Sequence, residues 1–358
     1  MERRSLEFHK KGFIAVVLLI LLGELSLTVQ PLFVASNQVT LTSEFGTGGT
    51  LKVTYDFKQG SYPNTIRVAV FPTFDALFDR DIFVYCDQDY PSSLVSLSGW
   101  LGIIDHLEEN QRLKGYRGKL ETVNALRLRD VMLQRNDSVV IIPSGVLPET
   151  VHTKESSLVR QFMENGGIMI WVGDVFAYYS GKPRGQLQPS SSENPGLEAQ
   201  EEILGFVLSN TTELNLATEK TMVSNGLSLK YTGLQAGIYV DEVLRHDGLV
   251  LGKTSGNMTS LATVPVGNGF LVVFSGKVSP ARSELGEDFV ASDIMTILLS
   301  GIIYSNGQFA YNVIDRTDVH SQSLILDVTD ERIRGAVFLA VSDDYYSYYF
   351  YRQFIPRP

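Results

Sequence analysis

The chain has 358 residues, of which 40 are acidic and 30 are basic, so its formal net charge is −10. This length can form one large domain or two modest ones with a real core. The acidic balance argues against nucleic acid and anionic membrane surfaces as partners, since both need a basic face. A single cysteine, Cys86, excludes an internal disulfide and a cysteine-based metal site. The five histidines show no ligand spacing, so the sequence predicts no metal and no cofactor.

Residues 1–36 are expected to be a signal peptide or a membrane anchor. Basic residues precede an apolar run at 13–22, which is typical of a secretory signal. A second apolar stretch at 25–35 makes the whole segment long enough to span a bilayer. Glu24 would then lie near the membrane centre, at a cost on the order of 2.5–3.5 kcal/mol. Cleavage and anchoring both remain open, and both place the body outside the cytoplasm.

Three N-glycosylation sequons, at Asn136, Asn210 and Asn257, are compatible with a body outside the cytoplasm. Tripeptides of this kind also arise by chance in a chain of this length. We therefore expect either a single N-terminal anchor in the cell membrane or secretion after cleavage, with the sequons as glycosylation candidates.

The body begins with β structure at 37–80 and then changes to alternating strands and helices. Residues 51–57 and 65–71 alternate apolar and polar side chains, as half-buried strands do. From residue 81 the pattern indicates a mainly parallel sheet with helices on both faces, an α/β three-layer sandwich. The predicted elements there are strands at 81–86, 119–123, 138–142 and 168–172, and helices at 94–107, 126–133 and 154–164.

The second half of the chain is less regular. Residues 178–195 are rich in Ser, Pro, Gly and Gln, which predicts a surface loop. A helix is expected at 196–206, strands at 248–252, 260–264 and 269–274, and an apolar core helix at 288–304. Residues 307–358 show only β patterns and end in a tyrosine cluster at 345–351, which predicts a small C-terminal β appendage. The α/β domain would therefore occupy 81–306.

Four segments carry a family resemblance: SVVIIPSG at 138–145, LVRQFMENGG at 158–167, IMIWVGD at 168–174 and VGNGFLVVF at 266–274. Together they make the region from 80 to 305 resemble the class I glutamine amidotransferase-like superfamily. The resemblance implies a flavodoxin-like fold, and this fold hosts many activities.

The catalytic pair of that family is missing from this chain. The family places a nucleophilic cysteine after the fourth strand, where this sequence reads Val172-Gly173-Asp174. Its partner histidine would follow the strand ending at Phe274, where none is present. Cysteine chemistry needs a thiolate beside a base. The resemblance therefore points to a non-catalytic member, with glutaminase activity excluded.

Candidate ligand-binding residues gather where the strands of an open α/β sheet end. They are Asp87, Asp89, Tyr90, Ser144, Asp174 and Lys277. The carboxylates could bind a cation or act as acid and base, or they could only start turns and cap helices. Ser144 lacks the flanking glycines of a nucleophile elbow. Cys86 is read as a structural thiol, with a nucleophile as the alternative.

The leading hypothesis is a non-catalytic, membrane-tethered or exported binding or scaffold domain. Its expected partner is another membrane or cell-surface protein, or an envelope component. The tyrosine cluster at 345–351 could form such an interface, stack on sugars or simply pack on the main domain. The alternatives are an envelope-glycan hydrolase or transferase that uses carboxylates at the sheet edge, and a small-ligand sensor with a closed apolar pocket.

Overall fold

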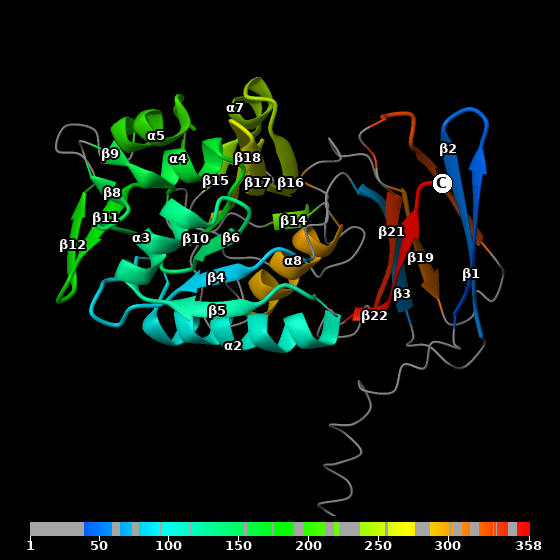
Figure 1. The fold of residues 1–358 in the computed structure, drawn as a ribbon, viewed down its shortest axis with the longest axis horizontal. Helices are drawn as coiled ribbons and strands as arrows, with labels where there is room; N and C mark the ends of the chain where they lie inside the picture. The colour runs from blue at the N-terminus through cyan, green and yellow to red at the C-terminus, as the bar shows by residue number, and fades with distance from the viewer. Residues whose placement is uncertain are drawn as a thin grey trace, which may run out of the picture.

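The computed structural model describes most of the chain after residue 38 (Figure 1). The described residues are 39–58, 65–73, 79–93, 95–114, 116–153, 156–173, 175–189, 197–208, 210–211, 218–221, 237–254, 257–275, 287–300, 303, 310–315, 322–331, 333, 335–342 and 349–358. The predicted leader at 1–36, Asp174, Lys277 and most of the tyrosine cluster lie outside them. Within these ranges, no helix has the length and apolar character needed to cross a bilayer.

The largest sheet of the described chain has ten strands in the order β13-β15-β17-β18-β10-β6-β4-β5, with β16 also on β17 and β14 on β16. Its strands are β4 (Ile82–Tyr85), β5 (Leu120–Val123), β6 (Val139–Ile142), β10 (Ile168–Gly173), β13 (Asn210–Thr211), β14 (Thr218–Thr221), β15 (Gly237–Tyr239), β16 (Leu249–Thr254), β17 (Met258–Val266) and β18 (Gly269–Ser275). Strand β10 pairs in parallel with β6 and β18, and β4 pairs in parallel with β5 and β6. Strands β4, β6 and β10 are buried at every position, as apolar parallel strands should be.

The sheet turns antiparallel at β17, because β17 and β18 form a tight hairpin. Val266 pairs with Gly269, so only Gly267 and Asn268 make the turn. Gly267 has a φ of 60°, a left-handed conformation that glycine adopts without steric cost. Strands β13 to β16 continue the antiparallel pairing beyond this hairpin.

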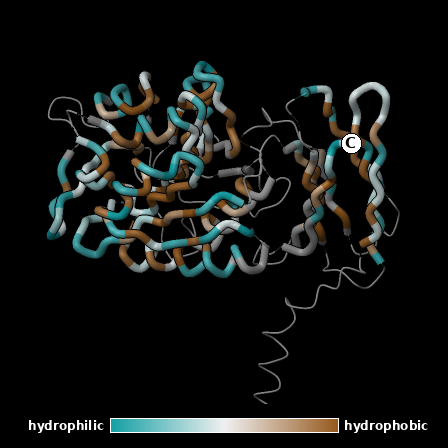
Figure 2. Tube along the Cα trace, in the orientation of Figure 1, coloured by the Kyte–Doolittle hydropathy of each residue, from teal (hydrophilic) through white to brown (hydrophobic). Residues whose placement is uncertain are grey.

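Helices cover the parallel strands on both faces. Helices α2 (Leu97–Lys114) and α8 (Glu287–Ser300) lie together on one face, and α3 (Ala125–Gln134), α4 (Leu158–Glu164) and α5 (Leu197–Leu204) lie on the other (Figure 1). Helix α7 (Val240–Arg245) packs on β16 and β17. Figure 2 shows the hydrophobic residues concentrated along the strands between these helices.

The two ends of the described chain build a separate β-sandwich. Strands β1 (Val39–Gly46) and β2 (Thr50–Phe57) form one sheet with β20 (Gln322–Asp327). Strand β3 (Thr65–Thr73) forms the other with β19 (Ala310–Asp315), β21 (Gly335–Ser342) and β22 (Tyr349–Pro356). The sheets share a core in which Tyr55 lies against Phe338, with ring centroids 5.6 Å apart.

Strand β3 joins the sandwich to the larger unit because both of its faces are buried. Ile66, Val68 and Val70 belong to the sandwich core, whereas Ala69 and Phe71 belong to the core of the ten-stranded sheet. Helix α8 contacts β3 and β21 on this second face. The sheet that contains β3 is therefore a shared wall between two hydrophobic cores.

The predicted strands and helices are largely confirmed, but the fold class is wrong. The flavodoxin-like three-layer sandwich required a mainly parallel sheet, and half of this sheet is antiparallel from β17 onward. The strands of the predicted small C-terminal β appendage do not form a unit by themselves, because they pair with strands near the amino end. Tyr55 of β2 lies opposite Gln322 of β20, and Val70 of β3 lies opposite Ala310 of β19. The hydrophobic periodicity of a sequence predicts where a strand lies, but it does not predict which strand it pairs with.

Leu326 and Ile325 of β20 provide a matched test of the sandwich. Leu326 is 3% exposed in the shared core and Ile325 is 64% exposed. We expect Leu326→Ala to lower the free energy of unfolding by about 2–5 kcal/mol. Ile325→Ala should change it by no more than about 0.5 kcal/mol. Urea denaturation of both variants checks this, and equal losses would contradict the observed pairing of β20 with β2.

Candidate functional site

The carboxyl edge of the sheet is formed by the segments that follow β4, β6 and β10. Residues 86–93 follow β4, residues 143–146 follow β6, and residues 175–177 follow β10. The structure brings Asp87, Asp89 and Tyr90 together on the first segment and places Ser144 on the second. Asp174 and Lys277 are outside the described residues.

The Asp87 carboxylate holds the start of α3. Its Oδ2 accepts a hydrogen bond of 3.1 Å from the backbone N–H of Ala125, and its Oδ1 accepts one of 3.2 Å from the N–H of Asp89. The N-cap residue Asn124 accepts a further bond of 2.9 Å from the N–H of Arg127. Two of the otherwise unpaired amides at this helix end are thereby satisfied. The helix-capping alternative is therefore the one the structure supports for Asp87.

The Ser144 hydroxyl is used inside its own turn. Ser144 is buried, and its Oγ donates to the carbonyl of Val146 at 3.1 Å and accepts from the N–H of Val146 at 3.3 Å. Its backbone carbonyl accepts a bond of 2.9 Å from the N–H of Ser93. A nucleophilic serine needs an exposed hydroxyl beside a base, and Ser144 does not meet this requirement.

Neighbouring segments cover the carboxyl edge. A Cβ added to Gly173, whose φ is 119°, would lie 3.1 Å from Cα of Gly145 and 3.2 Å from the carbonyl oxygen of Ser93. The segment after β4 therefore lies directly against the ends of β6 and β10. Only glycine fits at 173, both for this space and for its backbone conformation.

Part of the predicted loop 178–195 is a β-hairpin that packs on the same edge. It consists of β11 (Tyr179–Lys182) and β12 (Gln186–Pro189), and β11 pairs with β7 (Leu147–Pro148) at the left end of the molecule in Figure 1. The N–H of Gly185 donates to the carbonyl of Asp89 at 3.0 Å. The segment after β4 and this hairpin thus cover part of the edge predicted to bind a ligand.

Cys86 is half-buried and its thiol is not activated. Burial, and secondarily the charge of Asp87, raises the pKa of the Cys86 thiol above its ordinary value. The neighbouring Tyr85 hydroxyl is buried without a hydrogen-bond partner, and burial likewise raises its pKa. A reactive cysteine needs a depressed pKa, so the structural interpretation of Cys86 is favoured.

His152 is a buried neutral imidazole between β8 (His152–Thr153) and α5. It is 3% exposed, its Nδ1 has no hydrogen-bond partner, and its Nε2 lies 3.8 Å from Oε2 of Glu202, beyond hydrogen-bond distance. Burial lowers the pKa of His152 to about 4. The nearby carboxylate would raise that pKa, but Glu202 is 45% exposed and solvent screens its charge. His152 therefore contributes to stability more clearly than to chemistry.

A cavity of about 420 Å³ lies at the opposite, amino edge of the sheet. This amino-edge cavity is formed by the first residues of β16 and β18, the last part of β17 and the chain after α8. Its described lining residues are Asp247, Gly248, Leu249, Thr263, Pro265, Phe270 and Ile303. Among these described residues, the polar side chains are one hydroxyl and one carboxylate.

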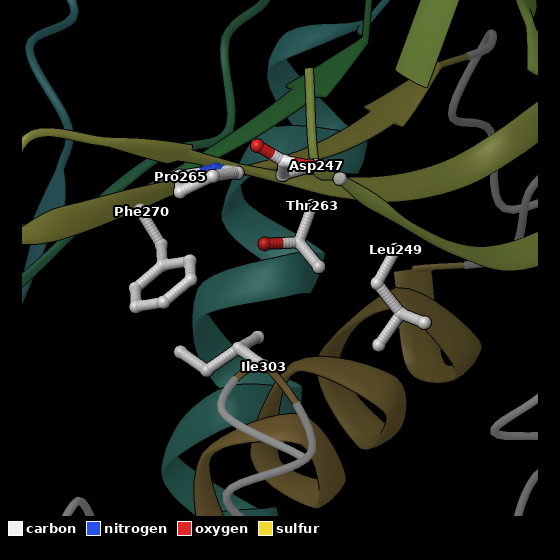
Figure 3. Close-up of a pocket in the computed structure, with 7 residues that line it drawn as sticks. Asp247, Leu249, Thr263, Pro265, Phe270 and Ile303 are labelled. Atoms are coloured by element: carbon white, nitrogen blue, oxygen red, sulfur yellow. The ribbon is translucent and has the colours of Figure 1, made fainter. Parts of the chain in front are cut away.

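The Thr263 hydroxyl is the buried polar group of the amino-edge cavity. Thr263 is 2% exposed, and its Oγ1 has no hydrogen-bond partner in the protein. Figure 3 shows this oxygen directed toward Phe270, with the Thr263 methyl group directed toward Leu249. Burying an unpaired hydroxyl costs roughly 1–3 kcal/mol. A bound molecule that hydrogen-bonds the hydroxyl would recover that cost, but it must first shift the cavity wall, because Oγ1 has less than 1 Å² of accessible surface.

Asp247 brings the carboxylate to the amino-edge cavity from an unusual backbone position. It follows the C-cap residue His246 of α7 and has a φ of 54°, where glycine is the ordinary choice. The N–H of Gly248 closes the turn on the carbonyl of Val243 at 2.9 Å. Asp247 is exposed, and in Figure 3 it lies across the cavity from Ile303.

Sequence reasoning missed the amino-edge cavity. Asp247-Gly248 has the form of an ordinary turn, and Thr263 has the form of an inward residue of a strand. Leu249, Thr263 and Ile303 are separated in sequence and meet only after β17 folds back on β18. No cluster of three or more potential metal ligands occurs among the residues that the structure describes.

The three glycosylation candidates lie at different kinds of position. Asn136 and Asn257 are exposed in turns, and Asn257 has a φ of 55°. Asn210 begins β13, opposite Ile238. Their glycosylation stays a prediction.

The solved structures named below are only weakly similar to this chain. No family model and no curated protein matches the chain. Among solved structures, a cytoplasmic protein of Salmonella typhimurium LT2 is 11% identical, with a TM-score of 0.38, over 61% of this chain and 98% of that one. A cold-adapted β-galactosidase from Rahnella sp. R3 is 13% identical, with a TM-score of 0.38, over 69% of this chain and 41% of that one. A β-galactosidase from Bacillus circulans is 8% identical, with a TM-score of 0.34, over 77% of this chain and 40% of that one. These TM-scores are below 0.5, so neither fold nor function is inferred from them.

Asp87 and Asp89 form a matched pair for testing the capping role. Asp87→Ala removes an acceptor from two backbone amides, so we expect the free energy of unfolding to fall by about 1–2 kcal/mol. Asp89 is exposed, and Asp89→Ala should change it by no more than about 0.5 kcal/mol. Chemical denaturation of both variants measures the difference. If Asp87→Ala leaves the free energy of unfolding unchanged, the capping role of the carboxylate is contradicted.

His152 predicts acid-dependent stability. Its folded-state pKa of about 4 lies below the ordinary value of 6.5, so the unfolded chain takes up the proton more readily. The contribution of His152 to the free energy of unfolding is complete above pH 6.5, declines as the pH falls, and levels off near pH 4. The loss amounts to up to about 3 kcal/mol. His152→Leu should flatten the unfolding free energy against pH by this amount, and a pH dependence that persists in this variant would contradict the role of His152.

Proposed function

We propose that the chain is a non-catalytic binding domain, exported or tethered to the membrane, that takes a small organic molecule in the amino-edge cavity. The observation that carries the proposal is a cavity of ligand size, about 420 Å³, whose wall contains the buried and unpartnered Thr263 hydroxyl. Ligand pockets typically have volumes of about 300–1,000 Å³ and apolar walls with a few placed polar groups.

The condition of the carboxyl edge supports binding over catalysis. The rival glycan hydrolase needs two carboxylates on opposite sides of a cleft. Asp87 and Asp89 belong to one turn, and the Asp87 carboxylate bonds two backbone amides, one of them that of Asp89. The hairpin β11–β12 lies where a substrate would enter. Acid–base chemistry through these residues is not supported.

Two earlier expectations stay proposals beside this one. The resemblance to class I glutamine amidotransferases stays a proposal without the flavodoxin-like fold that it implied, and under it the missing cysteine and histidine would make the chain a non-catalytic member. The leader at 1–36 supports a location outside the cytoplasm, where a partner in the envelope would be accessible. A ligand-binding domain at a membrane can pass a binding event to such a partner.

Thr263→Val and Thr259→Val give opposite predicted effects on the same strand. Thr263→Val removes an unpaired hydroxyl, so we expect the ligand-free full chain to become more stable by about 1 kcal/mol. The Thr259 hydroxyl donates to the carbonyl of Leu261 at 2.8 Å, so Thr259→Val should destabilise the chain by about 1–3 kcal/mol. Urea denaturation without ligand measures both.

Ligand binding is tested with the same variants in a fragment screen by ligand-observed NMR on the full chain. Hits that occupy the amino-edge cavity should bind Thr263→Val about 2- to 12-fold more weakly, the range expected for one hydrogen bond. A screen without hits in the cavity, or hits that are indifferent to Thr263→Val, would refute the proposed function.

A further inference from the structure

The β-sandwich is closed on one side and open on the other. One of its sheets has three strands, β1, β2 and β20, and the sheet that faces it has four. On the closed side β20 contacts β19 and β3, and Nδ2 of Asn312 on β19 donates to Oε1 of Gln322 on β20 at 2.9 Å. On the other side, Gln353 of β22 is exposed although it lies opposite the core residue Phe338. The shorter sheet therefore has an unfilled strand position next to β1.

Side chains of β1 that face the sandwich core are accessible to solvent. Ser43 lies opposite the core residue Val53 and shares its face of the sheet, yet Ser43 is exposed. Leu41 and Phe45, on the same face, are only partly buried against the core. A strand added beside β1 would cover these three side chains of β1.

The outer edge of β1 can accept such a strand. Among the described strands β1 pairs only with β2, over the whole of Val39–Gly46 and without a register shift. In an antiparallel pair, every second residue turns its backbone N–H and C=O away from the partner strand. Lysine, proline or a bulge commonly protects an exposed edge, and β1 has none of these, with Glu44 as its one charged residue. The edge is therefore suited to strand addition.

A second copy of the chain does not fit this edge. The facing sheet has one strand more, β22, on the open side. If two copies paired through β1, their four-stranded sheets would meet in the same space beside β22. The occupant must therefore be a single extended segment, and the chain itself supplies 38 residues directly before Val39.

Residues 25–30 have the sequence pattern that the open position needs. They read Leu-Ser-Leu-Thr-Val-Gln, an alternation of apolar and polar side chains that is typical of a strand with one buried face. In a membrane span these polar residues and Glu24 would lie among lipid tails, whereas in a strand they can face water. Pro31, which cannot donate a ladder hydrogen bond, ends the pattern. Residues 31–38 are then long enough to reverse the chain into β1.

We propose that residues 25–30 form a fourth strand, antiparallel to β1, with Leu27 opposite Ser43 and the polar side chains on the outer face. This register pairs apolar residues with each other, namely Leu25 with Phe45 and Val29 with Leu41. The segment then belongs to the folded domain, and the apolar run at 13–22 has by itself the length of a signal-peptide core. The proposal is independent of the amino-edge cavity and of any ligand.

Engineered cysteine pairs in the full chain test the position of the segment. In a Cys86→Ser background, Leu27→Cys with Ser43→Cys should form an intramolecular disulfide in most of the protein, because directly opposite residues have the required Cα separation. Thr28→Cys with Ser43→Cys is the matched control, and it should stay mostly reduced because Thr28 points to the other face. Peptide mapping without reductant measures both.

Two results of the cysteine experiment would overturn the proposal. One is an equal yield of the two intramolecular disulfides, including none of either. The other is a disulfide between two chains that carry Ser43→Cys alone, since it would place a second copy at the β1 edge.

Hydrogen exchange of β1 tests the same pairing without added cysteines. Leu27→Asp places a carboxylate on the core side and should release the segment, so the outer-edge amides of β1 should exchange about five- to tenfold faster, as expected for the loss of one hydrogen bond. Thr28→Asp brings the same charge to the outer face and should leave these rates unchanged. One common rate in the unchanged chain and in both variants would contradict the fourth strand.

The mass of the protein purified from cells that make the full chain is the last check. A chain that starts at or before Leu25 retains the segment, as the proposal requires. Cleavage after Ala35 would remove the segment and overturn the proposal, whatever the amino-edge cavity binds.

Discussion

The burial of β3 and β21 on both faces is the constraint on which the whole molecule depends. One face of their sheet carries Val68, Val70 and Phe338 into the sandwich core, and the other carries Phe71 and Val337 into the core of the ten-stranded sheet. A strand with apolar residues on both sides has no face that is suited to contact with water. The two cores therefore cannot separate without exposing one side of this wall to water, which makes the sandwich and the α/β unit mutually dependent.

The two edges of the ten-stranded sheet have opposite characters, and the difference follows from small residues and turns. At the carboxyl edge, Gly173 and Gly145 allow the segment around Ser93 to lie against the strand ends. At the amino edge, the β17–β18 hairpin and the end of α8 leave the space beside Thr263 unfilled. Open α/β sheets usually bind ligands at the carboxyl ends of their strands. In this chain neighbouring segments cover part of that location, and the cavity beside Thr263 lies at the opposite edge of the sheet.

Sequence patterns predicted the elements well and their partners badly. The apolar runs at 139–142 and 168–173 and the helix at 158–164 were identifiable because their periodicity is local. The pairing of β2 with β20 joins residues about 270 positions apart, as the bond between Thr54 and Ser323 shows, and nothing local encodes it. The turn Gly267-Asn268 was a visible hairpin signal, and it alone could have revealed the antiparallel half of the sheet. For the site, the capping role of Asp87 was foreseeable from residue type, whereas Thr263 and Asp247 gained meaning only from a cavity built by distant segments.

The pairing of the chain ends also sets the order in which this protein can fold. A ribosome releases β1, β2 and β3 early, yet β20 and β21, which complete both sheets of the sandwich, follow only after residue 321. Non-local pairing of this kind is slow, because the chain between the partners must be closed first. During that delay the apolar faces of β2 and β3 remain open to other chains, which makes them the segments most exposed to aggregation. The α/β unit between them can collapse first. Strand β3 can then pack one face on α8 before the last strands are synthesised.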